Sequence, residues 1–142
     1  MPGSKQRIYD SHADDMKIPE CLKRDVETRI QRCAEEHYHG KYTRIDVRFR
    51  GQFCYIDAYT EPSVPDNWPP TGISETREEY IKRRRNIPWH LCRLRHLGND
   101  RWSPAFFLYS QLKYEPSFFS NGEAVGTPED AFLLGAQFHL TD

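Results

Sequence analysis

Two alternating stretches joined by a glycine turn decide the fold: YTRIDVRF (residues 42–49), RG (50–51) and QFCYIDAY (52–59). Two such runs around a two-residue loop predict a β-hairpin. With the loop at 50–51, one face carries Ile45, Val47, Cys54, Ile56 and Ala58. The other face then carries Arg44, Asp46, Arg48, Phe53, Tyr55, Asp57 and Tyr59. This register places Arg44 opposite Asp57, which is a favourable cross-strand charge pair.

Further along the chain, residues 89–97 and 102–109 predict a second hairpin, and residues 113–119 predict a fifth strand. Pro104 lies inside the second of these runs, which predicts an edge position or a bulge there. In the run 89–97, alternation assigns one face to His90, Cys92, Leu94 and His96. The opposite face is assigned Leu91, Arg93, Arg95 and Leu97.

A first helix is predicted from residues 18–20, where Pro19 suits the first helical position, to a stop at Gly40. Its apolar face has helical spacing and consists of Leu22, Val26, Ile30, Cys33 and His37.

Two more helices are predicted from their caps. Thr76 and Glu79 fit a capping box, and the helix they begin ends at residues 86–88. We expect Tyr80, Ile81 and Arg84 to face inward on it. In the last helix Thr127 is the cap and Pro128 takes the first position. Its expected buried stripe is Phe132, Leu133, Ala136 and Leu140.

The predicted order is α-β-β-α-β-β-β-α, an α+β fold in which three helices pack on an antiparallel sheet of about five strands. A chain of 142 residues is typical of one domain. We expect a flexible N-terminal tail over residues 1–16 and a single domain over residues 17–142.

Composition excludes several classes of protein. The 20 basic and 21 acidic residues nearly balance, and no apolar run approaches the roughly 20 residues of a membrane helix. The N-terminus has no apolar segment typical of a signal peptide. Four cysteines without a C-x-x-C pair indicate reduced, structural thiols, so we expect a cytoplasmic protein.

The candidate binding site is a sheet face lined by arginine and aromatic side chains. Between residues 82 and 101, seven cations accompany a single acid, Asp100. Arginine binds anionic groups through paired hydrogen bonds, and tyrosine and tryptophan supply contact area. The candidate residues are Arg44, Arg48, Tyr55, Tyr59, Trp68, Arg93 and Arg95. The same pattern also fits a solvated sheet face or a dimer contact.

Trp68 lies in the stretch EPSVPDNWPPTG (61–72), which holds four of the ten prolines. Proline excludes a helix or a central strand there. The stretch therefore predicts a long loop, in which Trp68 either packs inward or contacts a partner.

Other chemistries have weaker support. A small enzyme could use a His/Cys pocket around His90, Cys92 and His96. Residues 82–101 could bind nucleic acid weakly, although a pI near 6.6 lies well below that of dedicated nucleic-acid domains and argues against this partner. Cys33 and His37 have a spacing that can chelate zinc, but nothing completes the site, and we expect no metal and no cofactor.

Three segments carry a resemblance: GQFCYIDAY (51–59), TREEYIKRRRNIPWHLCRLRHLGNDRWSPAFFLYS (76–110) and KYEPSFFSNGEAVGTPEDAF (113–132). They resemble a family of short, uncharacterised bacterial proteins over roughly residues 41–140. The resemblance implies a bacterial, cytoplasmic, stand-alone domain, and it carries no activity, cofactor or catalytic residue. The sequence thus favours a non-enzymatic binding or interaction module that forms a homodimer and takes a small anionic or protein ligand.

Overall fold

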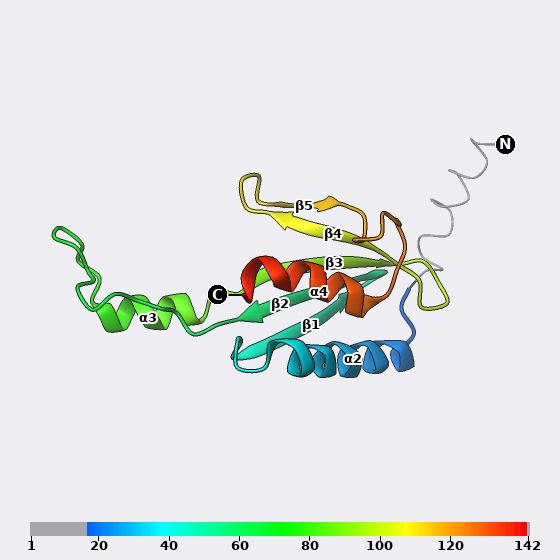
Figure 1. Ribbon diagram of the computed structural model, residues 1–142, viewed down its shortest axis with the longest axis horizontal. Coiled ribbons are helices and arrows are strands. Elements are labelled where there is room, and N and C mark those ends of the chain that lie inside the picture. Colours follow the sequence, from blue (N-terminus) through cyan, green and yellow to red (C-terminus); the bar gives the residue numbers. More distant parts are fainter. Residues whose placement is uncertain (1–16, 142) are drawn as a thin grey trace.

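The computed structural model describes residues 17–141 and contains one antiparallel sheet, whose strands lie side by side in chain order (Figure 1). The strands are β1 (Arg44–Arg50), β2 (Phe53–Tyr59), β3 (Trp89–His96), β4 (Trp102–Leu108) and β5 (Lys113–Pro116). The helices of the described residues are α2 (Glu20–Tyr38), α3 (Arg77–Arg85) and α4 (Pro128–His139). This order confirms the predicted α+β class. The predicted tail, residues 1–16, lies outside the described residues.

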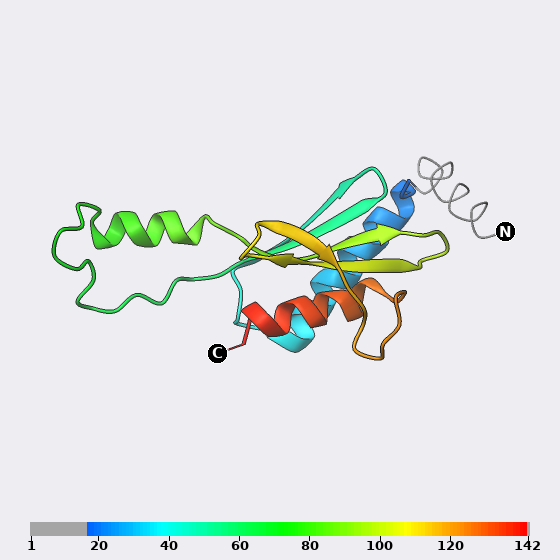
Figure 2. The same cartoon turned by 90° about the horizontal axis from the view of Figure 1, so that it is seen from above.

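Helices α2 and α4 cover the same face of the sheet, and Figure 2 shows both on one side of it. The core lies between these helices and the inward side chains of the strands. Its largest buried side chains include Val26, Ile30, Ile56, Leu91, Leu94, Trp102 and Phe132. Among the described residues, no helix covers the opposite face, which we call the open face.

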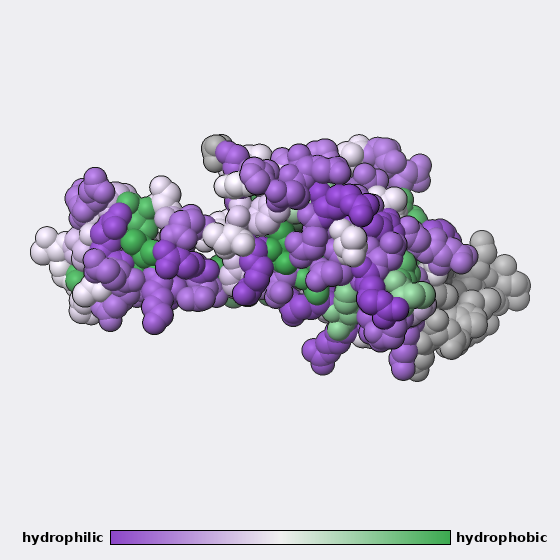
Figure 3. All heavy atoms as spheres, turned by 90° about the horizontal axis from the view of Figure 1, so that it is seen from below, coloured by the Kyte–Doolittle hydropathy of each residue, from purple (hydrophilic) through white to green (hydrophobic). Residues whose placement is uncertain are grey.

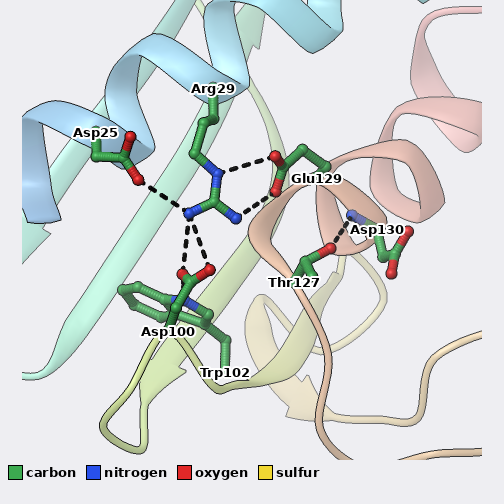
Figure 4. Close-up of polar contacts among 7 residues, drawn as sticks. All are labelled: Asp25, Arg29, Asp100, Trp102, Thr127, Glu129 and Asp130. Carbon is green, nitrogen blue, oxygen red and sulfur yellow. Dashed lines mark hydrogen bonds and ion pairs between the residues drawn. The ribbon is translucent and has the colours of Figure 1, made fainter.

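Arg29 of α2 makes polar contacts with α4 and with the β3–β4 turn (Figure 4). Arg29 donates to both carboxylate oxygens of Glu129, at 2.9 and 2.7 Å, in the first turn of α4. It also donates to Asp25 on its own helix and to Asp100 in the β3–β4 turn. The Trp102 indole donates to the same Asp100 at 2.9 Å. Arg29 therefore fixes both helices and one turn relative to each other.

The first hairpin forms as predicted but in a different register. Gly51, at φ +61°, takes the first central turn position, so Arg50 pairs with Phe53. A positive φ at this position is typical of the type II′ hairpin turn, which favours glycine there. Arg44 consequently lies opposite Tyr59, and the predicted pairing of Arg44 with Asp57 is wrong. The shift is two residues, so each side chain keeps its predicted face.

A β-bulge in β3 changes which side chains share a face. Ile56 pairs with Cys92 but Asp57 pairs with His90, which leaves Leu91 as an extra residue. Leu91 and Cys92 are both buried in the core. The extra residue turns His90 to the open face beside Asp57. The prediction that His90 shares a face with Cys92 is therefore wrong.

Strand β4 is an interior strand, which corrects the edge position or bulge predicted from Pro104. The Pro104 carbonyl accepts from Ser117 N at 3.0 Å, just past the end of β5. In an antiparallel strand the N–H and C=O of one residue point to the same neighbour. The hydrogen that proline lacks would thus point to Ser117, at the end of the β4–β5 pairing, so the sheet loses one hydrogen bond there.

Helix α2 begins after Pro19, which is the N-cap rather than the first helical residue. Its buried residues are Val26, Ile30, Cys33 and Ala34. His37 is exposed, contrary to its predicted place on this face, and Tyr38 packs against the core instead. Tyr38, one position after His37, therefore provides the aromatic ring that packs on the core at this end of α2.

Helix α4 confirms the predicted cap. The Thr127 hydroxyl accepts from the backbone N–H of Asp130 at 3.2 Å, and Pro128 is the first helical residue. Predicted stripe residues Phe132, Ala136 and Leu140 are buried. Leu133 packs against the core while half-buried.

Residues 60–88, which include α3, form an arm between β2 and β3. The predicted capping box at Thr76 and Glu79 is confirmed. The prediction that Tyr80, Ile81 and Arg84 face inward is wrong, because no residue of the arm is buried. The arm projects from the body (Figures 1 and 2) and appears as a separate lobe beyond a narrow waist (Figure 3).

The arm is held together mainly by its own contacts. Trp68 stacks on Tyr80 with ring centroids 4.0 Å apart. Arg77 donates to the Val64 carbonyl at 2.9 Å, and Arg83 donates to both carboxylate oxygens of Glu75. The arm thus has a defined shape without adding a layer to the core.

Candidate functional site

The open face brings together six of the seven predicted site residues. They are Arg44, Arg48, Tyr55, Tyr59, Arg93 and Arg95, which come from β1, β2 and β3. Trp68 is not among them, since it lies in the arm against Tyr80. The six therefore share one face, as alternation predicts, and Trp68 lies apart from them.

Two arginines of this face have aromatic partners but no carboxylate. The Arg44 guanidinium carbon lies 4.0 Å from the Tyr59 ring centroid. That of Arg93 lies 4.7 Å from the Phe53 centroid and 5.4 Å from the Tyr114 centroid. Within residues 17–141, no acidic group lies at ion-pair distance from Arg44 or Arg93, and the buried Nε of Arg93 has no hydrogen-bond partner. Both cations are positioned by rings and remain available to an anion.

A buried carboxylate lies at the centre of the open face. Asp57 accepts from Nη2 of Arg48 at 2.9 Å and from Nδ1 of His90 at 3.0 Å. An ionised carboxylate only accepts hydrogen bonds. Asp57 therefore orients the His90 ring through Nδ1. The Arg48 guanidinium pairs with this carboxylate, so its charge is compensated locally.

Aromatic side chains of β4, β5 and the turn after β4 surround His90. Phe107 lies 4.7 Å from the His90 ring centroid, and Tyr109 and Tyr114 both lie 6.3 Å from it. The Tyr109 hydroxyl accepts from the His90 backbone N–H at 2.9 Å. Burial raises the pKa of Tyr109 and of Tyr114, which keeps both hydroxyls protonated at neutral pH.

Sequence reasoning missed this aromatic group and the outward side chain of His90. The signal was present in two places. Leu91 and Cys92 are consecutive apolar residues that interrupt the alternation of their strand, as a bulge does. Phe107 and Tyr109 are two residues apart, which is the spacing of side chains on one face of a strand.

The structure does not assemble the predicted His/Cys pocket. His90 lies on the open face, whereas Cys92 is in the core and His96 is buried against Trp102, with ring centroids 4.8 Å apart. Burial raises the pKa of Cys92 well above its usual range and that of Cys54 to about 12. Both thiols are therefore protonated at neutral pH, a state in which cysteine is a poor nucleophile.

The zinc alternative has no geometric support either. Cys33 is buried and His37 is exposed, so the two side chains do not converge. Across residues 17–141, no three His, Cys, Asp or Glu side chains are grouped as metal ligands.

A cleft of about 700 Å³ lies where the arm joins the body, at the waist seen in Figure 3. The arm forms one wall, and the α2–β1 turn and the end of α4 form others. Trp89, Tyr109 and His139 contribute aromatic rings to it. No part of the sequence analysis predicted this cleft, because its walls come from segments far apart in the chain.

Comparison with known proteins found no matching family model, no matching curated protein and no matching solved structure. No residue role is therefore transferred from a relative. Separately, no helix within the described part of the chain is both long and apolar enough to cross a membrane.

Proposed function

We propose that this protein is a binding module whose open face takes an acidic segment of a protein partner. The observation that carries this proposal is the state of Arg44 and Arg93, which lie over aromatic rings without a carboxylate among the described residues. Planar guanidinium groups held in place bind carboxylates through two parallel hydrogen bonds.

The shape of the surface favours a protein over a small molecule. Adjacent strands lie about 4.8 Å apart, so the five strands span roughly 19 Å. The cation–aromatic surface extends from Arg44 on β1 to Tyr114 on β5. Arginine and tyrosine are also the residue types that contribute most to the affinity of protein interfaces.

The sign of the charge excludes pairing of two open faces. Such a dimer would bring Arg44 and Arg93 of both copies into one interface without a compensating acid, and like charges across an interface are unfavourable. An acidic partner has the complementary charge. The chain's nearly balanced composition favours such a local contact over general nucleic-acid binding.

Fluorescence anisotropy with a labelled deca-glutamate peptide tests the proposal on the full chain. The double variant Arg44→Gln/Arg93→Gln should weaken binding by about tenfold or more, because charge-assisted hydrogen bonds are lost. Arg24→Gln is the matched control, since Arg24 is exposed on α2, which lies on the other face of the sheet.

The proposal is wrong if the peptide does not bind, or if the double variant binds it as well as the unmodified chain does. Tighter binding of a labelled oligothymidylate than of the peptide would also overturn it, in favour of a nucleic-acid partner.

We also propose a homodimer, and the arm is the observation that favours it. Residues 60–88 have no buried member, and Ile73 is 49% exposed. Contact with a second chain would bury the exposed side chain of Ile73. Ile73→Asp should shift sedimentation velocity profiles toward monomer, whereas Leu112→Asp, at an exposed position outside the arm, should not. A monomer at about 100 μM would exclude a dimer of useful affinity.

A cytoplasmic location is a further part of the proposal. All four cysteines are free, and Cys21 is exposed, which is the usual state of thiols in a reducing compartment. Cell fractionation with detection of the native chain tests it, and recovery in an extracytoplasmic fraction would contradict it.

A further inference from the structure

The cleft at the base of the arm has an aromatic floor. Trp89 and His139 stack with centroids 4.9 Å apart and planes 18° apart. Tyr109 lies edge-on to both, at 5.8 Å from each centroid. These three rings, from β3, α4 and the turn after β4, thus form one continuous aromatic surface, which is the floor of the cleft. A cleft of about 700 Å³ is within the size range of small-molecule sites.

One cation of the cleft lacks an acidic partner. Arg83 donates to Glu75, and Glu61 of the lining accepts from Arg85. The hydrogen-bond partner of Arg84 is the neutral Tyr80 hydroxyl, at 3.4 Å. No carboxylate of residues 17–141 lies at ion-pair distance from Arg84, so its charge is available in the cleft wall.

Neutral polar groups lie beside the rings. The Tyr109 hydroxyl accepts one hydrogen bond from the His90 backbone, which leaves its own hydrogen to donate. Burial lowers the pKa of His139, so its ring is neutral at pH 7 and offers both a donor and an acceptor. The cleft therefore combines a flat apolar surface, two directional polar groups and the cation of Arg84, which has no carboxylate partner among residues 17–141.

From this combination we infer that the cleft is a second binding site, for a small molecule that has a planar aromatic ring and one anionic group. The ring packs against the floor of Trp89, Tyr109 and His139, and the anion binds Arg84. Because Arg84 belongs to the arm and the floor belongs to the body, a bound molecule links the two. This site is separate from the open face and does not depend on the acidic partner proposed there.

The probe for the test is 8-anilinonaphthalene-1-sulfonate, a fluorescent planar aromatic anion, titrated into the full folded chain. N-phenyl-1-naphthylamine is its uncharged counterpart and lacks only the sulfonate. Arg84→Gln should weaken binding of the sulfonate about tenfold and leave binding of the amine unchanged. Lys82→Gln is the matched control, because Lys82 is an exposed cation of the same helix that does not line the cleft.

A second measurement locates the probe. The Trp89 indole N–H signal, assigned with Trp89→Phe, should move on titration, and amide exchange in residues 60–88 should slow because the ligand links arm and body. Equal sulfonate binding by Arg84→Gln and the unmodified chain overturns the inference. So does a loss of binding on Arg93→Gln instead, because the probe then occupies the open face.

Discussion

The backbone of Gly135 lies so close to Leu91 that a Cβ atom on Gly135 would stand 2.4 Å from the Leu91 carbonyl oxygen. Gly135 is in the middle of α4, and Leu91 is the extra residue of the β3 bulge. The atom in the way belongs to the backbone, so no change of rotamer relieves the clash. Helix α4 rests directly on the bulge at this point.

Gly135→Ala should therefore destabilise the fold by about 2 kcal/mol, the usual cost of overpacking a core. Alanine favours a helix over glycine by about 1 kcal/mol, which offsets only part of this cost. Urea unfolding followed by circular dichroism measures the change. The control is Gln137→Ala at an exposed position of α4. Equal or greater stability of Gly135→Ala would show that α4 can move away from β3 freely.

Arg29→Met should destabilise the fold by about 2 kcal/mol, because it leaves Glu129 and Asp100 without their charged donor. The Arg29 side chain is only 18% exposed, so water replaces its hydrogen bonds poorly. Arg32→Met is the matched control, since Arg32 is an exposed arginine of the same helix. Similar midpoints of urea unfolding for the two variants would contradict a clamp at Arg29.

The same cluster predicts a loss of stability in acid. Hydrogen bonds from Arg29 hold the pKa of Glu129 and of Asp100 below their ordinary values. A carboxyl with a lowered folded-state pKa stabilises the fold at neutral pH, and this stabilisation disappears as the pH falls from about 5 to 2. Unfolding free energies at several pH values should decline less steeply for Arg29→Met. A parallel decline in both proteins would place the acid sensitivity elsewhere.

Asp57→Asn should cost about 1 to 2 kcal/mol, since it removes the charge that both Arg48 and His90 contact while keeping the shape of the side chain. A double-mutant cycle with Arg48→Gln should show coupling, because the two residues share a hydrogen bond at 2.9 Å. Asp46→Asn, across the strand pair from Asp57, is the control. Additive effects in the cycle would mean that the buried carboxylate does not depend on Arg48.

Thiol labelling should distinguish one cysteine from the other three. Cys21 is exposed, whereas Cys33, Cys54 and Cys92 are buried. Burial raises the pKa of Cys33 to about 11 and that of Cys54 to about 12, so few of these thiols are ionised at pH 8. Ellman's reagent should modify one thiol per native chain quickly and all four in urea. Rapid modification of two or more in the native chain would contradict this burial.

Local rules predict most of this fold from sequence. Thr76 and Thr127 each lie three residues before the backbone N–H that their hydroxyl caps, a spacing that can be read from the sequence. Alternation in β1 and β2 assigns each side chain to the correct face. The predicted register was wrong because Gly51 can occupy either central position of a two-residue turn. Which position it occupies depends on the backbone conformation of the turn, which the sequence does not specify. The role of α3 was misjudged, because Tyr80 and Ile81 are too few to form an apolar stripe, and such a helix need not pack on the core.

The site is less predictable than the fold, since it depends on contacts between distant segments. The arginines of the open face follow from alternation alone. The contact of Asp57 with His90 follows from one extra residue in β3, and the cleft follows from the path of the arm. Sequence periodicity predicts which side chains share a face of one helix or strand, but it does not predict which helices and strands contact each other.

The arm leaves β2 and enters β3 at neighbouring points, since Ala58 pairs directly with Trp89. The β2–β3 pairing holds the two ends of the arm side by side, so a change in the length of the arm changes the loop-closure entropy only slightly. This connection can thus be lengthened, shortened or exchanged while the rest of the fold persists. The β2–β3 junction is a natural insertion point, suited to evolutionary variation and to grafting a foreign peptide.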